Sequence, residues 1–224
     1  MNTKLFLLSI LVISLIIQCS MEEPVDQSGQ KVIEADVCVY TANASGIMAA
    51  LAVKAEGKSV VVVEPSQWVG GILGAGIKPI QDCPNFDAVG GNTKKIMGFL
   101  GTGQRNPLPE DSLRKLMRRT SPKQIREDFL QILKENNIEV IYNHRVSLVN
   151  KTNNEIQEAI FDFAPVDSTG SPSPQPKIKS ALRVISKVYI DAGYEGDLMA
   201  MSAVSYRVGR ESTYDYNEQS AGVG

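Results

Sequence analysis

The segment ADVCVYTANASGIMAALAVKAEGKSVVVVEP, residues 35–65, determines how the chain folds. It begins with a short apolar run (36–40), passes through small residues (41–46), and continues as an Ala-rich stretch that ends at Gly57. Four valines and Glu64 follow. This order predicts a strand, a tight turn, a helix and a second strand. Because strands joined by a helix lie parallel, we predict an α/β fold with a parallel sheet flanked by helices.

The turn of this unit resembles an incomplete nucleotide-binding motif. In the G-x-G-x-x-G motif the pyrophosphate lies at the helix N-terminus, and an acidic residue at the end of the second strand binds the ribose. Glu64 supplies the acid and Gly46 the third glycine, while Thr41 and Asn43 stand at the first two positions. Asn tolerates positive φ better than β-branched Thr does. The pattern fits a nucleotide site, or a unit that only builds the sheet.

A glycine-rich segment, residues 65–80, follows the second predicted strand. Its density of glycines indicates positive φ angles or a close approach to the backbone. We interpret it as a loop packed against a cofactor. The alternative is a surface loop with an exposed Trp68.

Composition excludes several classes of protein. The chain has 23 Lys and Arg residues against 25 Asp and Glu, a net charge of −2, which does not favour binding to nucleic acid. Three cysteines do not make a disulfide framework. His144 is the only histidine, so we predict no metal site.

The N-terminus has the features of an export signal. Lys4 precedes an apolar run from Leu5 to Ile17, which is shorter than the roughly 20 residues of a membrane span. We therefore predict a signal peptide over residues 1–20, with Cys19 as a lipidation site that would anchor the protein to a membrane of the cell envelope or periplasm. An uncleaved anchor is the alternative. Residues 21–33 are predicted to be a linker.

The rest of the chain predicts further α/β structure. We expect an α-helix that begins at Ser121 and Pro122, and a small antiparallel β element around residues 146–190. Residues 165–176 are rich in Ser and Pro and predict a hairpin tip or linker. A strand then enters a small-residue turn at Asp191, followed by a helix over 198–203.

Several motifs together resemble a known family. They are Ser45-Gly46, Glu64-Pro65 and Gly70-Gly71, then DAGYEGDLMA at 191–200 and SYRVGRE at 205–211. In this order they resemble the FAD-dependent oxidoreductases with the two-dinucleotide-binding-domain fold, in the xanthan-lyase-like branch of exported bacterial proteins. The chain departs from the family at Thr41 and Asn43, and at Gly193, where the family usually has threonine.

The resemblance implies FAD as cofactor and assigns residues to its parts. The expected contacts are Thr41, Asn43, Ser45 and Gly46 with the pyrophosphate, Glu64 (beside Pro65) with the adenosine ribose, Gly70 and Gly71 with the flavin side, the Val146 main chain with the adenine, and Ala192 and Gly193 with the pyrophosphate–ribityl region. No catalytic acid or base stands out.

The expected function is that of an exported FAD-dependent oxidoreductase, or its FAD-binding portion. It would transfer hydride between flavin and an unknown small-molecule or carbohydrate-derived substrate. Because family members continue beyond this length, we expect residues 34–224 to be an incomplete FAD-binding domain without a substrate domain, which a separate chain could carry. Two alternatives stay open: a non-catalytic remnant that has lost FAD binding, and an NAD-dependent dehydrogenase.

Overall fold

One six-stranded sheet organises the protein. The computed structural model describes residues 29–76, 88–104, 109, 120–171 and 173–222; Cys19 and the predicted signal peptide lie outside them. The strand order is β3-β2-β1-β6-β5-β4. Their bounds are β1 (Lys31–Tyr40), β2 (Val60–Val63), β3 (Glu139–Ile141), β4 (His144–Thr152), β5 (Glu155–Phe163) and β6 (Ile178–Asp191).

Parallel and antiparallel pairing meet at β6. From Leu182 to Asp191, β6 pairs in parallel with the whole of β1. On its other edge, β6 pairs antiparallel with β5, which in turn pairs antiparallel with β4. On the other side, β1 pairs in parallel with β2, and β2 with β3. The predicted fold class is therefore confirmed, and the antiparallel element is continuous with the parallel sheet because both share one 14-residue strand.

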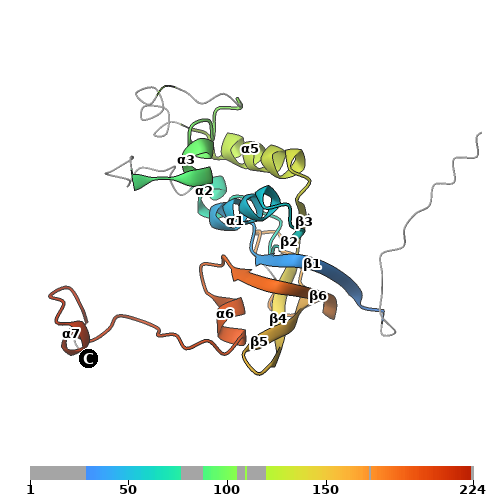
Figure 1. Cartoon of the computed structure of the whole chain (residues 1–224), viewed down its shortest axis with the longest axis vertical. Helices are drawn as coiled ribbons and strands as arrows, with labels where there is room; N and C mark the ends of the chain where they lie inside the picture. The colour runs from blue at the N-terminus through green and yellow to red at the C-terminus, as the bar shows by residue number, and fades with distance from the viewer. Residues whose placement is uncertain (1–28, 77–87, 105–108, 110–119, 172, 223–224) are drawn as a thin grey trace, which may run out of the picture.

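Helices cover the sheet on both faces (Figure 1). Figure 1 shows α1, α2, α3 and α5 on one side and α6 on the other, while α7 lies away from the sheet. Their bounds are α1 (Ala44–Ala55), α2 (Gly71–Ala75), α3 (Gly91–Met97), α5 (Pro122–Glu135), α6 (Asp197–Met201) and α7 (Thr213–Tyr216). Within the described residues, no helix is long and apolar enough to cross a membrane.

The central strands are buried because both of their faces are covered. Along β1, Val37 and Val39 pack into the cluster beneath α1 and α5, whereas Cys38 and Tyr40 pack into the opposite cluster with Phe161. In β2, Val61 to Val63 are buried without alternation. Near-continuous apolar strands are typical of parallel sheets covered on both faces.

Helix α5 begins where its sequence predicts. Ser121 is the N-cap and Pro122 occupies the first turn, where a missing N–H costs nothing. Its buried apolar residues recur at helical spacing: Ile125, Phe129, Ile132 and Leu133.

Three boundaries differ from the sequence-based expectation. β1 begins at Lys31, so the last residues of the predicted linker belong to the sheet, because β6 is long enough to pair with them from Leu182 onward. The glycine-rich segment contains α2, a short helix rather than a loop throughout. Helix α6 ends at Met201, two residues before its predicted end.

A buried carboxylate ties α5 to the loop after α3. Asp128 is 1% exposed, and its Oδ2 accepts from the backbone N–H of Gly101 (2.6 Å) while its Oδ1 accepts from the Gln124 side chain (3.0 Å). Gly101 has a φ of +80° and leaves no room for a Cβ beside Thr120. The carboxylate thus satisfies a part-buried amide where the chain turns tightly.

We expect Asp128→Ala to lower the free energy of unfolding by about 2–3 kcal/mol, because it leaves the part-buried Gly101 N–H and the Gln124 side chain without their acceptor. Denaturant unfolding of the purified protein measures this. Glu127→Ala is the matched control: its side chain is half exposed and pairs weakly with Lys123 at 3.9 Å, so a change below about 0.5 kcal/mol is expected. Equal stability of the two variants would contradict the structural role of Asp128.

Candidate functional site

The carboxyl ends of three neighbouring strands meet at one edge of the sheet. The chain leaves β1 at Thr41, whose N–H donates to the Val63 carbonyl of β2 (2.8 Å). It leaves β6 at Ala192, whose N–H donates to the Tyr40 carbonyl of β1 (3.0 Å). In open α/β sheets, ligands bind in the crevice outside these carboxyl ends.

Asn43 joins the three segments that form this crevice. Its Oδ1 accepts from the backbone N–H of Gly46 (2.9 Å) and from the Ser45 hydroxyl (2.8 Å), which makes it the N-cap of α1. Its Nδ2 donates to the carbonyl of Ala192 after β6. Its backbone also forms a bridge with Gly70, before α2. Asn43 is only 4% exposed, so it positions the helix N-terminus from within the structure.

Gly46 permits the close approach that the motif requires. A Cβ at this position would overlap the carbonyl oxygen of Thr41 and would lie 3.3 Å from the Cβ of Ala192. Backbone atoms cannot move aside without shifting the turn. The third motif position therefore needs glycine here for contact between helix and strand.

Thr41 occupies a backbone conformation that favours glycine. Its φ is +78°, which is strained for a β-branched residue. Its buried hydroxyl has no hydrogen-bond partner among the described residues. Gly193 faces it, and a Cβ at Gly193 would lie 3.6 Å from the Cγ2 of Thr41.

Glu64 holds the turn from the end of β2. Its Oε2 accepts from the Ala42 N–H (2.6 Å), and its Oε1 accepts from the Ser66 N–H (2.9 Å) and hydroxyl (2.5 Å). The side chain is 6% exposed. Both oxygens therefore already bind the protein, while the carboxylate borders the crevice.

The diglycine before α2 lets that helix approach Asn43. Gly70 and Gly71 have positive φ values, and a Cβ on Gly71 would lie 2.7 Å from the Cβ of Asn43. The Ile72 N–H donates to the Tyr194 hydroxyl (2.9 Å), which links α2 to the turn after β6. Gly70 packs against Phe129 of α5.

These residues enclose a cavity of about 550 Å³. Of the predicted site residues, five line it: Thr41, Asn43, Glu64, Pro65 and Gly71. Five other predicted site residues do not line the cavity but make the contacts described above: Ser45, Gly46, Gly70, Ala192 and Gly193. Eight further lining residues were not assigned from the sequence: Ser66, Trp68, Ile72, Ala75, Thr169, Gly170, Tyr194 and Glu195. Of these, Tyr194 and Glu195 belong to a motif already noted, whereas Thr169 lies in the Ser- and Pro-rich connection and carries no recognisable signal.

Val146 does not line the cavity. Its side chain follows strand alternation into the core beside Phe161, and its N–H donates to the buried Tyr40 hydroxyl (3.4 Å). The neighbouring Asn143 and His144 do reach the site, through bonds from their N–H groups to the carbonyls of Ser66 (3.0 Å) and Glu64 (3.1 Å). The predicted contact of the Val146 main chain with the adenine therefore stays a prediction.

Carboxylates gather where β6 meets α6. Asp191 accepts from the N–H groups of Gly193 and Met199, both at 2.8 Å, and so shapes the turn. Burial, with further contributions from Glu195 and Asp191, raises the pKa of Asp197. On the other side of the site, burial lowers the pKa of His144, whose Nδ1 lies 2.7 Å from the Tyr142 carbonyl. The positive counterpart for an anionic ligand at this edge is the N-terminus of α1.

A larger cavity of about 910 Å³ lies elsewhere, around Asp36, Ser59 and Lys187. It adjoins the Asp36–Lys187 ion pair (2.9 Å). No carboxyl end of a parallel strand opens into it, so size alone does not make it the better cofactor site. Among the described residues, no group of His, Cys, Asp and Glu could hold a metal ion.

Comparisons with known proteins found solved structures to which this chain is similar. Solved structures similar to this chain include a 3-ketosteroid-Δ4-(5α)-dehydrogenase from Rhodococcus jostii RHA1 (10% identity, 78% of this chain and 48% of that chain, TM-score 0.41) and a p-nitrophenol 4-monooxygenase from Pseudomonas putida DLL-E4 (16%, 81% and 46%, TM-score 0.45). A flavocytochrome c3 fumarate reductase is also similar (16%, 73% and 34%, TM-score 0.44). The chain spans less than half the length of these proteins. A search of curated proteins found no match.

The model of one protein family covers nearly all of the folded part of the chain. It is described as FAD dependent oxidoreductase and matches residues 36–223, from within β1 to beyond α7. Together with the strand–turn–helix arrangement at the crevice, this match shows that the chain belongs to the FAD-dependent oxidoreductase family, whose cofactor is FAD.

Proposed function

We propose that this chain is the FAD-binding portion of an oxidoreductase that transfers hydride between a substrate and flavin. One observation carries the proposal: the N-terminus of α1 and the carboxylate of Glu64 border the same cavity, at the carboxyl ends of β1 and β2. A helix N-terminus suits a pyrophosphate, and an acidic residue at the end of the second strand suits a ribose. FAD contains both groups.

The residues present fit this cofactor. The Thr41 hydroxyl is a buried hydrogen-bond donor without a protein partner among the described residues, and Thr41 lines the cavity. A buried hydroxyl left unpaired costs free energy that a ligand oxygen would recover. Gly46 and Gly71 keep the turn compact, because a Cβ at either would meet its neighbours. Asn43 contacts both segments, as the N-cap of α1 and as the bridge partner of Gly70.

FAD, when bound, supplies the hydride acceptor or donor of the reaction. The residues of this chain bind and orient it. The α1 N-terminus attracts the negative charge of the pyrophosphate, and Asn43 fixes the direction of that helix relative to β6. The Glu64 carboxylate would accept hydrogen bonds from the ribose hydroxyls, in addition to the bonds it already accepts.

The location and substrate of the enzyme are part of the same proposal. Export through residues 1–20, with lipid attachment at Cys19, would place the protein in the cell envelope. The substrate would be a small or carbohydrate-derived molecule. The remaining wall of the flavin site would come from chain beyond this segment or from a separate chain. Family membership favours FAD over the NAD-dependent alternative.

The second candidate is a non-catalytic remnant that has lost FAD. Its support is the state of Glu64, whose two oxygens already accept three hydrogen bonds from Ala42 and Ser66. A carboxylate so engaged can be wholly structural. The strained conformation of Thr41 points the same way. Binding measurements separate the two candidates.

We expect the purified protein to bind FAD, and Glu64→Gln to weaken that binding at least tenfold. The amide loses the charge-assisted hydrogen bonds, each of which contributes roughly 1.5–3 kcal/mol. Flavin absorbance after gel filtration and titration calorimetry measure uptake and affinity. Circular dichroism shows whether the variant is folded, since Glu64 also holds the turn.

Glu56→Gln, beside the exposed C-terminal end of α1, is the charge-matched control and should bind FAD like the unchanged protein. A folded protein that takes up no FAD would favour the remnant. If the unchanged protein binds FAD and Glu64→Gln binds equally well, the ribose role of Glu64 is wrong.

A second prediction concerns the contact between Thr41 and Gly193. Thr41→Gly should raise the free energy of unfolding by about 1 kcal/mol, because relief of roughly 1–3 kcal/mol of strain exceeds the extra chain entropy of glycine. Gly193→Thr alone should destabilise, because its Cβ would lie 3.0 Å from the Asp191 carboxylate and face Thr41. Thermal unfolding of both variants and of the double variant measures their coupling.

Thr41→Ala provides the matched comparison, since it removes the hydroxyl and keeps the strained φ. The Thr41→Ala variant should not be more stable than the unchanged protein, whereas the Thr41→Gly variant should be. In the double variant, the cost of Gly193→Thr should be smaller than in the single variant, because Thr41 no longer occupies the facing space. If the effects of the two substitutions on the free energy of unfolding are strictly additive, the contact between Thr41 and residue 193 does not contribute to stability.

A further inference from the structure

The connection between β5 and β6 forms a compact turn at the cavity. Residues 165–171, the Asp167 turn, fold around one carboxylate: the Asp167 Oδ1 accepts from the Thr169 N–H (2.8 Å), the Thr169 hydroxyl (2.6 Å) and the Ser171 N–H (3.1 Å). The Gly170 N–H donates to the Asp167 carbonyl (3.1 Å). A segment predicted as a flexible tip is therefore internally hydrogen bonded.

This turn contributes a wall of the site. Thr169 and Gly170 line the same cavity as Glu64 and Trp68, although they are about a hundred residues away in sequence. Backbone bonds explain the proximity: the Asn143 N–H donates to Ser66 beside Glu64, and the Ala164 N–H donates to Asn143 (2.8 Å). The turn thus lies on the Glu64 side of the crevice.

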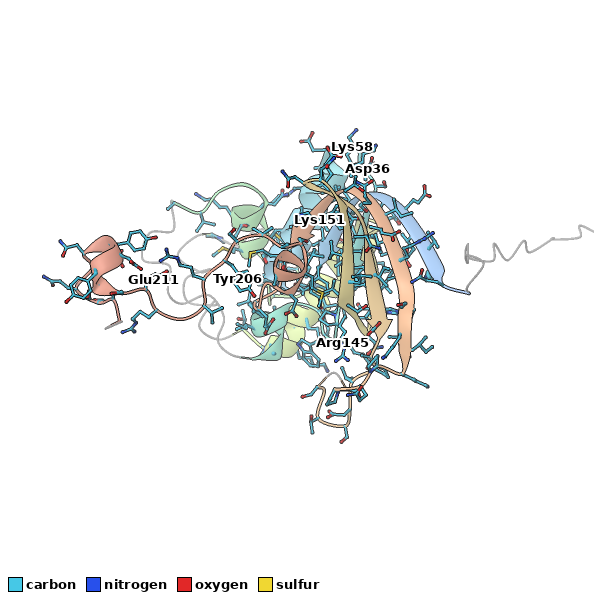
Figure 2. All side chains as sticks on the ribbon, turned by 90° about the horizontal axis from the view of Figure 1, so that it is seen from below. Asp36, Lys58, Arg145, Lys151, Tyr206 and Glu211 are labelled. Carbon is cyan, nitrogen blue, oxygen red and sulfur yellow. The ribbon has the colours of Figure 1, made fainter. Side chains whose placement is uncertain are left out.

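Arg145, near the start of β4, holds the connection in place. Its guanidinium donates to the carbonyls of Ser173 and Pro174, both at 2.8 Å. Figure 2 labels Arg145 at the end of the sheet where the β5–β6 connection extends from it. Two parallel donors on a planar group fix an orientation, which a single ammonium cannot do.

We propose that the Asp167 turn covers the adenosine half of the bound cofactor, and that Arg145 is the positioning residue that holds this turn over the nucleotide. The inference rests on the proposed function, since the ribose at Glu64 defines which half of FAD lies beneath the turn. It adds a wall to the predicted main-chain contact of Val146 with the adenine. Arg145 acts through the turn and does not touch the ligand.

The test compares ligands that share only the adenosine half. Arg145→Gln should weaken the binding of both FAD and ADP about tenfold, because the turn loses its two anchors. Arg145→Lys should weaken both as well, since it keeps the charge and cannot hold both carbonyls. Arg183→Gln is the control. Arg183 lies on β6, outside the cavity lining, and pairs with Glu158 at 3.6 Å. The Arg183→Gln variant should therefore bind FAD and ADP as tightly as the unchanged protein.

Hydrogen exchange gives a readout that is independent of activity. ADP should slow exchange of the Thr169, Gly170 and Ser171 amides in the unchanged protein, and FMN, which lacks adenosine, should not. Unchanged exchange with bound ADP, or unchanged FAD and ADP affinity in folded Arg145→Gln, would overturn this inference alone. Normal affinity in Arg145→Lys would assign the effect to charge and also overturn the positioning role. If the unchanged protein binds neither FAD nor ADP, both the proposed function and this inference are wrong.

Discussion

The arrangement of the site depends on the side chain of one buried amide. Asn43 caps α1, accepts from Ser45, and donates to the chain leaving β6. An N-cap contributes about 1 kcal/mol to helix stability. Here the same side chain also sets the position of the helix relative to two strands, because its other end is bonded across the crevice. A glycine at this position would allow a closer ligand but would remove that tie.

The departures from the glycine motif are physically connected. Thr41 keeps the positive φ that the first motif glycine normally adopts, so the backbone path of the turn is retained while the residue is strained. Gly193, on the facing turn, lies beside that side chain, and a Cβ there would be 3.6 Å from the Cγ2 of Thr41. Two substitutions that look like independent damage in the sequence therefore meet in one contact. The turn keeps its shape and gains a buried hydroxyl at the cavity.

Local patterns predicted most of the fold and only part of the site. The valines of β2, the capped start of α5 and the turn at Gly46 depend on neighbours in sequence, and they lie where the patterns indicated. The cavity walls at Thr169 and Tyr194 depend on pairing between distant strands. Polar residues in a Ser- and Pro-rich stretch look alike whether they face solvent or a ligand, so no pattern could mark Thr169. The place of the Val146 side chain in the core likewise follows from the register of β4 with β5.

The length of β6 joins the two halves of the site. Its C-terminal half pairs with β1 and ends at Asp191, beside the turn that precedes α1, while its N-terminal half pairs with β5 as well. A connection that leaves β5 must return to the start of β6, so it crosses the sheet edge near Asn143 and Ser66. The antiparallel strands are thus more than a cover for the core. Because they share β6 with the parallel sheet, the register that buries Phe161 also determines where the Asp167 turn stands relative to Glu64.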